Sequence, residues 1–264
     1  NKFNNDMTLQ VVIQRLENLL PQDDISNLLP HGDFDVEAYK TKLANYIKAV
    51  RTPGLRMLLE TIFSGATYER FVTNPAGMRM HHAYLGGLLQ HSVDVTGLAV
   101  ALAEQIEGVD KDLVIAGALL HDIGKIAIDD KILNKPGRLT QEEFNIMKTH
   151  TVIGANMLDK LGIYRSEALV RTAYEICRWH HERWDGRGYP DGLSGDRIPI
   201  SAQVVSMADV YDALVSKRVY KAAYAPDTAV QMILHGDCGT FNPLLLECLV
   251  EIQDVLKEDV TEAE

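Results

Sequence analysis

The feature that most constrains the fold is a series of histidines and aspartates that recurs at nearly regular intervals along the chain. Its members are separated by about 30 residues, the length of one helix and its connection in an α-helical bundle. Such spacing can bring a polar side chain from each successive helix to a common centre. The members are His91, His121, Asp122, His150, His180, His181 and Asp209.

Apolar residues recur at helical spacing between these positions, and no stretch alternates as a β-strand would. The sequence predicts helices over residues 7–20, 36–50, 53–65, 81–105, 112–123, 140–150, 151–161, 166–181, 200–216, 226–235 and 243–257. Thr52-Pro53 is expected to open the third of these helices and Gly65 to end it. Thr140 followed by Glu143 predicts a capping box.

The predicted elements indicate an all-α fold. We expect a small helical N-terminal region, residues 1–74, that serves regulation or dimerisation. A helical main domain follows, residues 75–264, and carries the whole histidine and aspartate series. Residues 182–198, dense in Gly, Pro and Asp, are expected to be an irregular loop.

Composition narrows the classes of partner. The 264-residue chain has a formal net charge of −11, which disfavours binding of long nucleic acid. A small anionic substrate remains compatible, because a bound metal creates its own local field. No apolar stretch reaches the roughly 18 residues of a membrane span, and the polar start predicts no signal peptide. Cys177, Cys238 and Cys248 form no disulfide framework, so we expect a cytoplasmic protein.

Imidazole and carboxylate side chains together suit a first-row transition metal. Seven ligands are too many for one ion, so the series predicts two metals that share a bridging carboxylate and a bridging water. Such a pair, about 3.5–4 Å apart, acidifies the water and clamps both oxygens of a phosphoryl displacement. His31 and His235 lie outside the series and are interpreted as structural residues.

Two motifs carry a resemblance to a known family. Residues 119–125, Leu-Leu-His-Asp-Ile-Gly-Lys, resemble the signature of the HD superfamily of phosphohydrolases. Residues 180–190, His-His-Glu-Arg-Trp-Asp-Gly-Arg-Gly-Tyr-Pro, are similar to the longer signature of its HD-GYP subfamily. Segments 135–140, 208–214, 218–221 and 239–243 also resemble this subfamily. The resemblance implies an HD-domain helical bundle.

The resemblance also implies an activity. HD-GYP proteins are phosphodiesterases that hydrolyse cyclic di-GMP to linear pGpG, and often on to GMP, through a metal-bridging hydroxide. When the family's ligand positions are transferred to this sequence, the first metal would be bound by His91, His121, Asp122 and Asp209. The second metal would be bound by His150, His180 and His181, with Asp122 bridging the two. The two ions would be Fe or Mn, with Zn, Ni and Co as alternatives.

The resemblance further assigns the residues around the metals. Lys125 would lie beside the hydroxide and the scissile phosphate, and with Asp122 would be catalytic. Arg218, Lys221 and Tyr189, with Lys125, would contact the substrate. The implied partner is a cyclic dinucleotide, and a homodimer or an upstream regulatory domain is compatible with the sequence.

Some positions depart from the family pattern or leave alternatives open. Gly87 stands where some HD-GYP members carry a glutamate ligand, so we expect two metals and not three. Residues 75–98 resemble the entry to the HD domain of certain exoribonucleases, with His81 and His82 either at the pocket rim or capping a helix. Asp212 either orients a metal ligand or faces water.

Two other functions therefore remain open. One is an HD-domain 3′ exonuclease or another nucleotide phosphohydrolase, against which the net charge of −11 argues. The other is a low-activity module that senses a cyclic dinucleotide or a metal.

Overall fold

The computed structural model describes residues 34–76, 84–135, 137–160, 168–216, 223–254 and 256. Within these ranges every regular element is helical and no β-strand occurs, as predicted. No helix in the described part of the chain has the length and apolarity needed to cross a membrane. The predicted helix over residues 7–20 lies outside the described residues.

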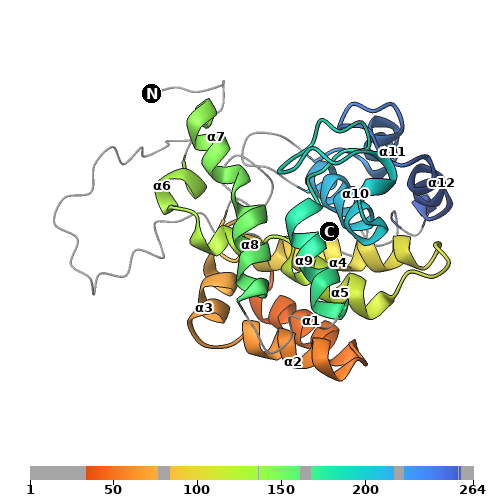
Figure 1. The fold of residues 1–264 in the computed structure, drawn as a ribbon. Coiled ribbons are helices and arrows are strands. Elements are labelled where there is room, and N and C mark those ends of the chain that lie inside the picture. The colour runs from red at the N-terminus through yellow and green to blue at the C-terminus, as the bar shows by residue number, and fades with distance from the viewer. Residues whose placement is uncertain are drawn as a thin grey trace. The chain divides into compact units, whose positions relative to one another are not determined.

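The helices follow one another along the chain without an intervening sheet (Figure 1). In order they are α1 (Val36–Ala49), α2 (Pro53–Ile62), α3 (Gly65–Thr73), α4 (Gly87–Ala103), α5 (Lys111–Leu120), η2 (Ile123–Ala127), α6 (Asp130–Leu133), α7 (Gln141–Lys148), α8 (His150–Asp159), α9 (Ala168–Trp179), η3 (Gly195–Arg197), α10 (Ile200–Val215), α11 (Pro226–Leu234) and α12 (Pro243–Glu251). The two η elements are short 3₁₀ helices.

Helix starts are fixed by side chains that satisfy the first free backbone N–H groups. The capping box predicted for α7 is confirmed: Thr140 accepts from the Glu143 N–H, and Glu143 accepts from the Thr140 N–H. Asp110 caps α5, and Asn242, followed by proline at the first helical position, caps α12.

Two predicted helix boundaries were wrong because glycine starts helices here. Gly65, expected to end a helix, has φ +54° and is the first residue of α3, while α2 already ends at Ile62. Gly86 has φ +79° and precedes α4, so that helix begins at Gly87 and not near residue 81. A left-handed glycine turns the chain sharply, which apolar periodicity alone does not reveal.

Two hydrophobic clusters form the core. One unites α1, α2 and α3 with α5, α8 and α9, and the other unites α10, α11 and α12. Helices α4, α5 and α9 contribute to both clusters: on α4, Leu88 and Leu89 pack in the first cluster, and Val95 and Ala99 in the second. Helices α1–α3 thus share a core with the central bundle. The division at residues 74/75 and a regulatory role of the N-terminal region stay predictions.

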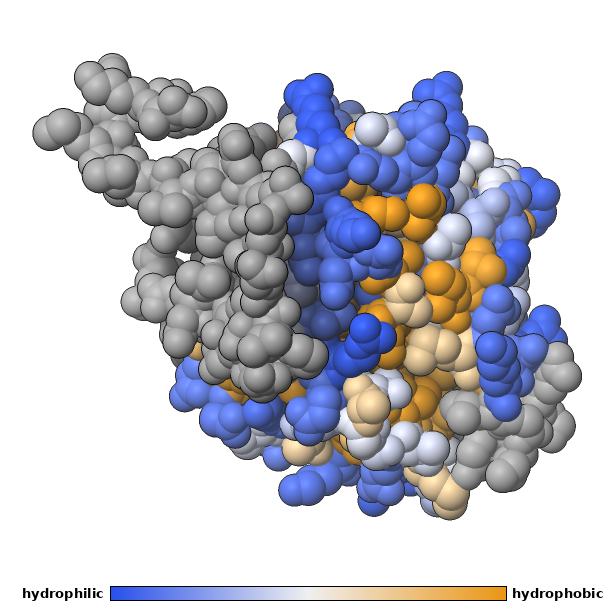
Figure 2. All heavy atoms as spheres, turned by 90° about the vertical axis from the view of Figure 1, so that its left-hand side faces the viewer, coloured by the Kyte–Doolittle hydropathy of each residue, from blue (hydrophilic) through white to orange (hydrophobic). Residues whose placement is uncertain are grey.

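Helices α6 and α7 lie to one side of the central bundle (Figure 1). The face of the molecule on that side carries a band of apolar side chains beside strongly hydrophilic ones (Figure 2). On α7 itself Phe144 is 41% exposed and Ile146 is 45% exposed. This helix therefore presents apolar side chains to solvent.

Candidate metal centre

The seven residues of the predicted series come together from successive helices. His91 lies in α4 and Asp209 in α10, whereas the others stand at helix ends. His121 and Asp122 occupy the junction of α5 and η2, His150 is the first residue of α8, and His180 and His181 directly follow α9. Six of them are buried, and the His181 side chain is 12% exposed.

Backbone carbonyls fix the orientation of three imidazoles. His121 Nδ1 lies 2.6 Å from Ala118 O, His150 Nδ1 lies 2.8 Å from Met147 O, and His180 Nδ1 lies 3.0 Å from both Ile176 O and Cys177 O. A carbonyl oxygen only accepts, so each Nδ1 must carry the proton. The Nε2 lone pairs of the neutral rings are therefore directed toward the cluster.

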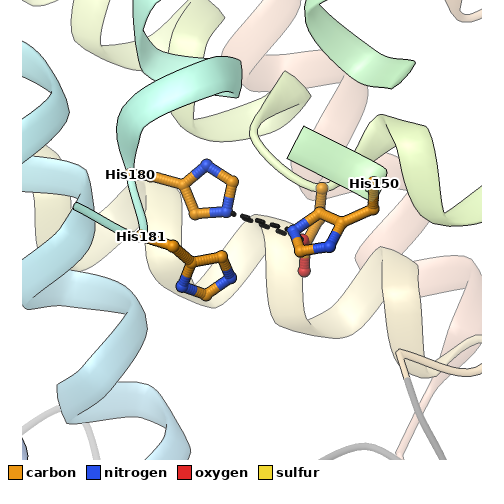
Figure 3. A group of neighbouring side chains, drawn as sticks. His150, His180 and His181 are labelled. Atoms are coloured by element: carbon orange, nitrogen blue, oxygen red, sulfur yellow. Dashed lines mark hydrogen bonds and ion pairs between the residues drawn. The ribbon is translucent and has the colours of Figure 1, made fainter. Parts of the chain in front are cut away.

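These Nε2 atoms meet in pairs. His91 Nε2 and His121 Nε2 are 3.2 Å apart, and His150 Nε2 and His180 Nε2 are 3.4 Å apart. Figure 3 shows the second pair, with His181 beside it. His150 and His180 both carry their proton on Nδ1, so their two Nε2 atoms cannot hydrogen-bond to each other, and a cation beside these facing lone pairs would be favourable.

Asp122 lies between the two pairs and turns one oxygen toward each. Its Oδ2 is 3.3 Å from His91 Nε2, and its Oδ1 is 3.2 Å from His150 Nε2. Among the described residues no hydrogen-bond partner satisfies the buried Oδ1. An orphaned carboxylate oxygen next to imidazole lone pairs is a donor set that fits a transition metal.

Two groups of ligand atoms share this carboxylate. One comprises His91, His121 and Asp122, and the other Asp122, His150, His180 and His181. Asp209 borders both groups, with Oδ1 3.3 Å from His91 Nε2 and Oδ2 3.8 Å from His181 Nδ1. Gly87, one turn before His91 at the start of α4, offers no side chain to either group.

Burial keeps most of the imidazoles neutral. It lowers the pKa of His180 to about 3, helped by the neighbouring His121 and His150 rings. Burial likewise lowers the pKa of His121, and burial together with His180 holds the pKa of His181 well below its usual range. Neutral imidazole is the form that binds a metal.

The carboxylates stay ionised for a different reason. Burial alone would raise the pKa of Asp122, but the Lys125 ammonium and the neighbouring imidazoles outweigh it and hold that pKa well below its usual range. His91 is the exception among the histidines. Burial would lower its pKa, but Asp122, Asp209 and Asp212 raise it well above its ordinary value.

Lys125 lies inside the cluster, 3% exposed, and donates to Asp122 Oδ2. Gly124 brings these residues close to His150: a Cβ on Gly124 would lie 2.0 Å from His150 O. Only glycine permits this approach of η2 to the start of α8. The glycine of the His-Asp-Ile-Gly-Lys motif is thus what places Asp122 beside His150.

Asp212 orients His91. Its Oδ2 lies 2.7 Å from His91 Nδ1, and its Oδ1 accepts from the Ser216 hydroxyl at 3.0 Å. Asp212 is buried, so the alternative that it faces water is wrong. A carboxylate behind a histidine is the usual way to fix a ligating ring.

Sequence reasoning missed a second carboxylate on the same side. Asp94 accepts from the Tyr39 hydroxyl of α1 at 2.9 Å, and burial followed by Asp212 raises the pKa of Asp94 to about 7. Asp94 stands three residues after His91, so it lies on the same face of α4. The spacing of Asp94 from His91 could have been recognised in the sequence. The contact with Tyr39 could not have been predicted, because it joins segments far apart in the sequence.

The loop after His181 is held by its own buried carboxylate. Glu182 accepts from the backbone N–H groups of Asp191 at 2.7 Å and Leu193 at 3.0 Å. Within this loop the Tyr189 ring lies 4.7 Å from the His181 ring at an interplanar angle of 31°. The predicted substrate residue Tyr189 therefore adjoins the cluster.

Some predicted residues cannot be placed. Arg218, Lys221, His31, His81 and His82 lie outside the described residues, so their roles stay predictions. His235 is exposed at the end of α11 and belongs to neither ligand group.

Comparison with known proteins agrees with this arrangement. The family model described as "HD domain" matches residues 88–214. A protein of Vibrio cholerae named "Probable cyclic di-GMP phosphodiesterase" is 42% identical over 174 residues, which cover 63% of this chain and 40% of the relative. A "3'3'-cGAMP-specific phosphodiesterase 2" of the same organism is 40% identical over 145 residues, 55% of this chain and 27% of the relative.

A solved structure matches the fold. An "HDG"Y"P protein" from Bdellovibrio bacteriovorus aligns with a TM-score of 0.51 at 20% identity, covering 84% of this chain and 65% of that one. The chain spans less than half the length of the two curated relatives. The resemblance predicted from the motifs is confirmed: residues 88–214 match the HD domain, and the curated relatives that share about 40% identity with this chain are named as cyclic dinucleotide phosphodiesterases.

Proposed function

We propose that this chain is a metal-dependent phosphodiesterase that hydrolyses cyclic di-GMP to linear pGpG, and further to GMP. The observation that carries the proposal is the buried Asp122 carboxylate, which turns one oxygen to each of two histidine groups. Two metal ions, Fe or Mn before Zn, Ni or Co, would supply Lewis acidity toward water and phosphate oxygens. The similarity to proteins named cyclic di-GMP phosphodiesterase supports the choice of substrate.

The proposal gives each residue a role. One ion would be held by His91, His121, Asp122 and Asp209, and the other by Asp122, His150, His180 and His181. The Lys125 ammonium lies beside Asp122, where it would stabilise the charge that develops on the phosphate. Arg218 and Lys221 are proposed to hold phosphate oxygens.

The expected substrate range follows from the same relatives. Their names include both cyclic di-GMP and 3'3'-cGAMP, so both dinucleotides belong in the test. Because Gly87 offers no third-metal ligand, we expect the conversion of pGpG to GMP to be slower than the opening of the ring. We place the activity in the cytoplasm, with residues 1–74 as a regulatory or dimerisation region.

The test is product analysis on protein loaded with Mn²⁺ or Fe²⁺, with metal content measured separately. Cyclic di-GMP, 3'3'-cGAMP and a short RNA would each be incubated with the protein and with Asp122→Ala. Formation of linear dinucleotide from a cyclic substrate, lost in the variant, is the expected result. No cleavage of either cyclic dinucleotide by fully loaded protein would overturn the proposal. Faster release of mononucleotides from the RNA would favour the exonuclease instead.

A further inference from the structure

The exposed fractions of the ligand side chains show which side of the cluster is open. The His91, His121 and His180 side chains are 0% exposed, and those of Asp122 and His150 are 2% exposed. His181 and Asp209 are 12% and 10% exposed. A substrate therefore reaches the cluster from the side of His181 and Asp209.

A lysine and two aromatic rings border this open side. The Tyr189 ring lies against the His181 ring in a tilted arrangement, and the Tyr189 backbone N–H donates to His181 O at 3.2 Å. Lys148, the last residue of α7, places its Nζ 5.7 Å from the centre of the Tyr189 ring. The same Nζ is 5.2 Å from the centre of the ring of Phe144, one turn earlier on α7. We call Phe144, Lys148 and Tyr189 the rim.

The rim is available to a ligand. Phe144 is 41% exposed, and Lys148 and Tyr189 are partly exposed. In the described part of the chain no carboxylate lies within ion-pair distance of Lys148, whereas Lys125 is committed to Asp122. Among the described residues the Lys148 ammonium lies over two ring faces, so its N–H donors are available to an incoming group.

We propose that the rim is a subsite for a guanine base of the cyclic dinucleotide, with Lys148 donating to the O6 and N7 edge. This inference rests on the proposed function. Aromatic rings provide stacking surfaces for any base, and the lysine adds selectivity. Guanine presents two acceptors, O6 and N7, on one edge, whereas adenine replaces O6 with an amino donor that a lysine repels.

The test compares Lys148→Met with the parent chain. Methionine keeps the stem between the rings and removes the charge. Binding of cyclic di-GMP and of cyclic di-AMP to the Mn²⁺-loaded proteins is measured by calorimetry, and hydrolysis of bis(4-nitrophenyl) phosphate, a diester without a purine, is followed in parallel. We expect the Kd for cyclic di-GMP to rise about tenfold. The Kd for cyclic di-AMP and the rate with the small diester should stay within about twofold.

Two further variants control the comparison. Lys148→Arg keeps a cation that pairs with the guanine edge, so it should restore the preference for cyclic di-GMP. Lys160→Met removes a lysine at the opposite end of α8 from His150, where the side chain is exposed, and should change none of the three measurements.

The outcomes separate this inference from the proposed function. An unchanged Kd for cyclic di-GMP in Lys148→Met overturns the guanine subsite, and so does equal weakening of both dinucleotides. If the parent chain cleaves the small diester but binds both dinucleotides equally, the subsite is overturned while the phosphodiesterase proposal stands. If the parent cleaves nothing yet loses guanine-selective binding in Lys148→Met, the proposed function fails and the subsite is supported.

Discussion

At the scale of single residues, Asp122 is the member that the two ligand groups share. Each of its oxygens faces a different histidine pair, so a single carboxylate would neutralise charge on two ions. We expect Asp122→Ala to lose bound metal and to reduce turnover by more than the roughly 100-fold that loss of an outer-shell partner costs. Metal content by mass spectrometry and the rate on cyclic di-GMP check this together. Full metal content in the variant would contradict the shared role.

For a Lys125 variant we expect the opposite effect on metal content, although Lys125 contacts the same carboxylate. Its ammonium pairs with Asp122 but is not itself a ligand, and bound metal ions would replace the charge that it supplies to Asp122. Lys125→Met should therefore retain its metals and lose turnover, by about 10²–10³-fold if it acts on the developing phosphate charge. The rate and the metal content of the same preparation decide the matter. A loss of metal equal to that of Asp122→Ala would assign Lys125 a structural role.

At the scale of elements, the centre depends on how closely η2 approaches α8. A Cβ on Gly124 would lie 2.0 Å from His150 O, so Gly124→Ala must push the two elements apart. We expect it to lower the free energy of unfolding by about 1–3 kcal/mol, the usual cost of overpacking, and to weaken metal binding. Urea denaturation measures the first effect.

A matched control lies in the same part of the chain. Among the described residues, chain neighbours apart, no atom lies within 4 Å of a Cβ built on Gly137, so Gly137→Ala should leave the free energy of unfolding unchanged or raise it slightly. Equal losses in the two variants would mean that the close approach at Gly124 does not matter.

The ligand series and the helical class could be predicted from the sequence because both are periodic. Helix-length intervals gave the convergence of His91, His150 and Asp209, and side-chain chemistry gave the capping box at Thr140. The start of α3 at Gly65 could not be predicted, because the left-handed conformation that begins a helix there leaves no apolar pattern.

Contacts between segments that are distant in the sequence also could not be predicted. Tyr39 with Asp94 and Lys148 with Tyr189 join residues whose proximity depends on helix packing and loop geometry. The position of Asp122 between two histidine pairs belongs to the same class. The sequence spacing predicted that Asp122 lies in the metal centre. The structure was needed to show that one of its oxygens faces each histidine pair.

At the scale of the whole described molecule, the centre lies where the two hydrophobic clusters meet. Helix α4, which carries His91, packs in both clusters. His150 comes from α8, which packs in the first cluster, and Asp209 from α10, which packs in the second. Bound ions would therefore tie the two halves of the core together, so the metal-free protein must carry buried imidazoles without that support. Its stability should depend on their protonation.

The pKa shift of His180 determines the direction of this pH dependence of stability. Burial lowers the pKa of His180 to about 3 in the folded, metal-free protein, whereas an exposed histidine has a pKa of about 6.5. At a pH between these two values His180 is protonated in the unfolded chain and neutral in the folded chain. The effect of His180 is therefore to make the free energy of unfolding fall as the pH drops below 6.5. His91 and Asp94, whose pKa values are raised, act in the opposite direction. A variant is therefore needed to isolate the single group.

We expect chelator-treated protein to lose stability relative to His180→Gln when the pH is lowered from 7.5 to 5. The loss should be on the order of 2 kcal/mol, which is 1.36 kcal/mol for each unit by which the pH lies below 6.5. Urea denaturation at the two pH values gives the four free energies. His235→Gln, at an exposed position, should follow the parent chain at both. If the parent and His180→Gln differ by the same amount at pH 7.5 and pH 5, the buried ring is not held neutral, and the lone pairs that would bind the metal are not preformed.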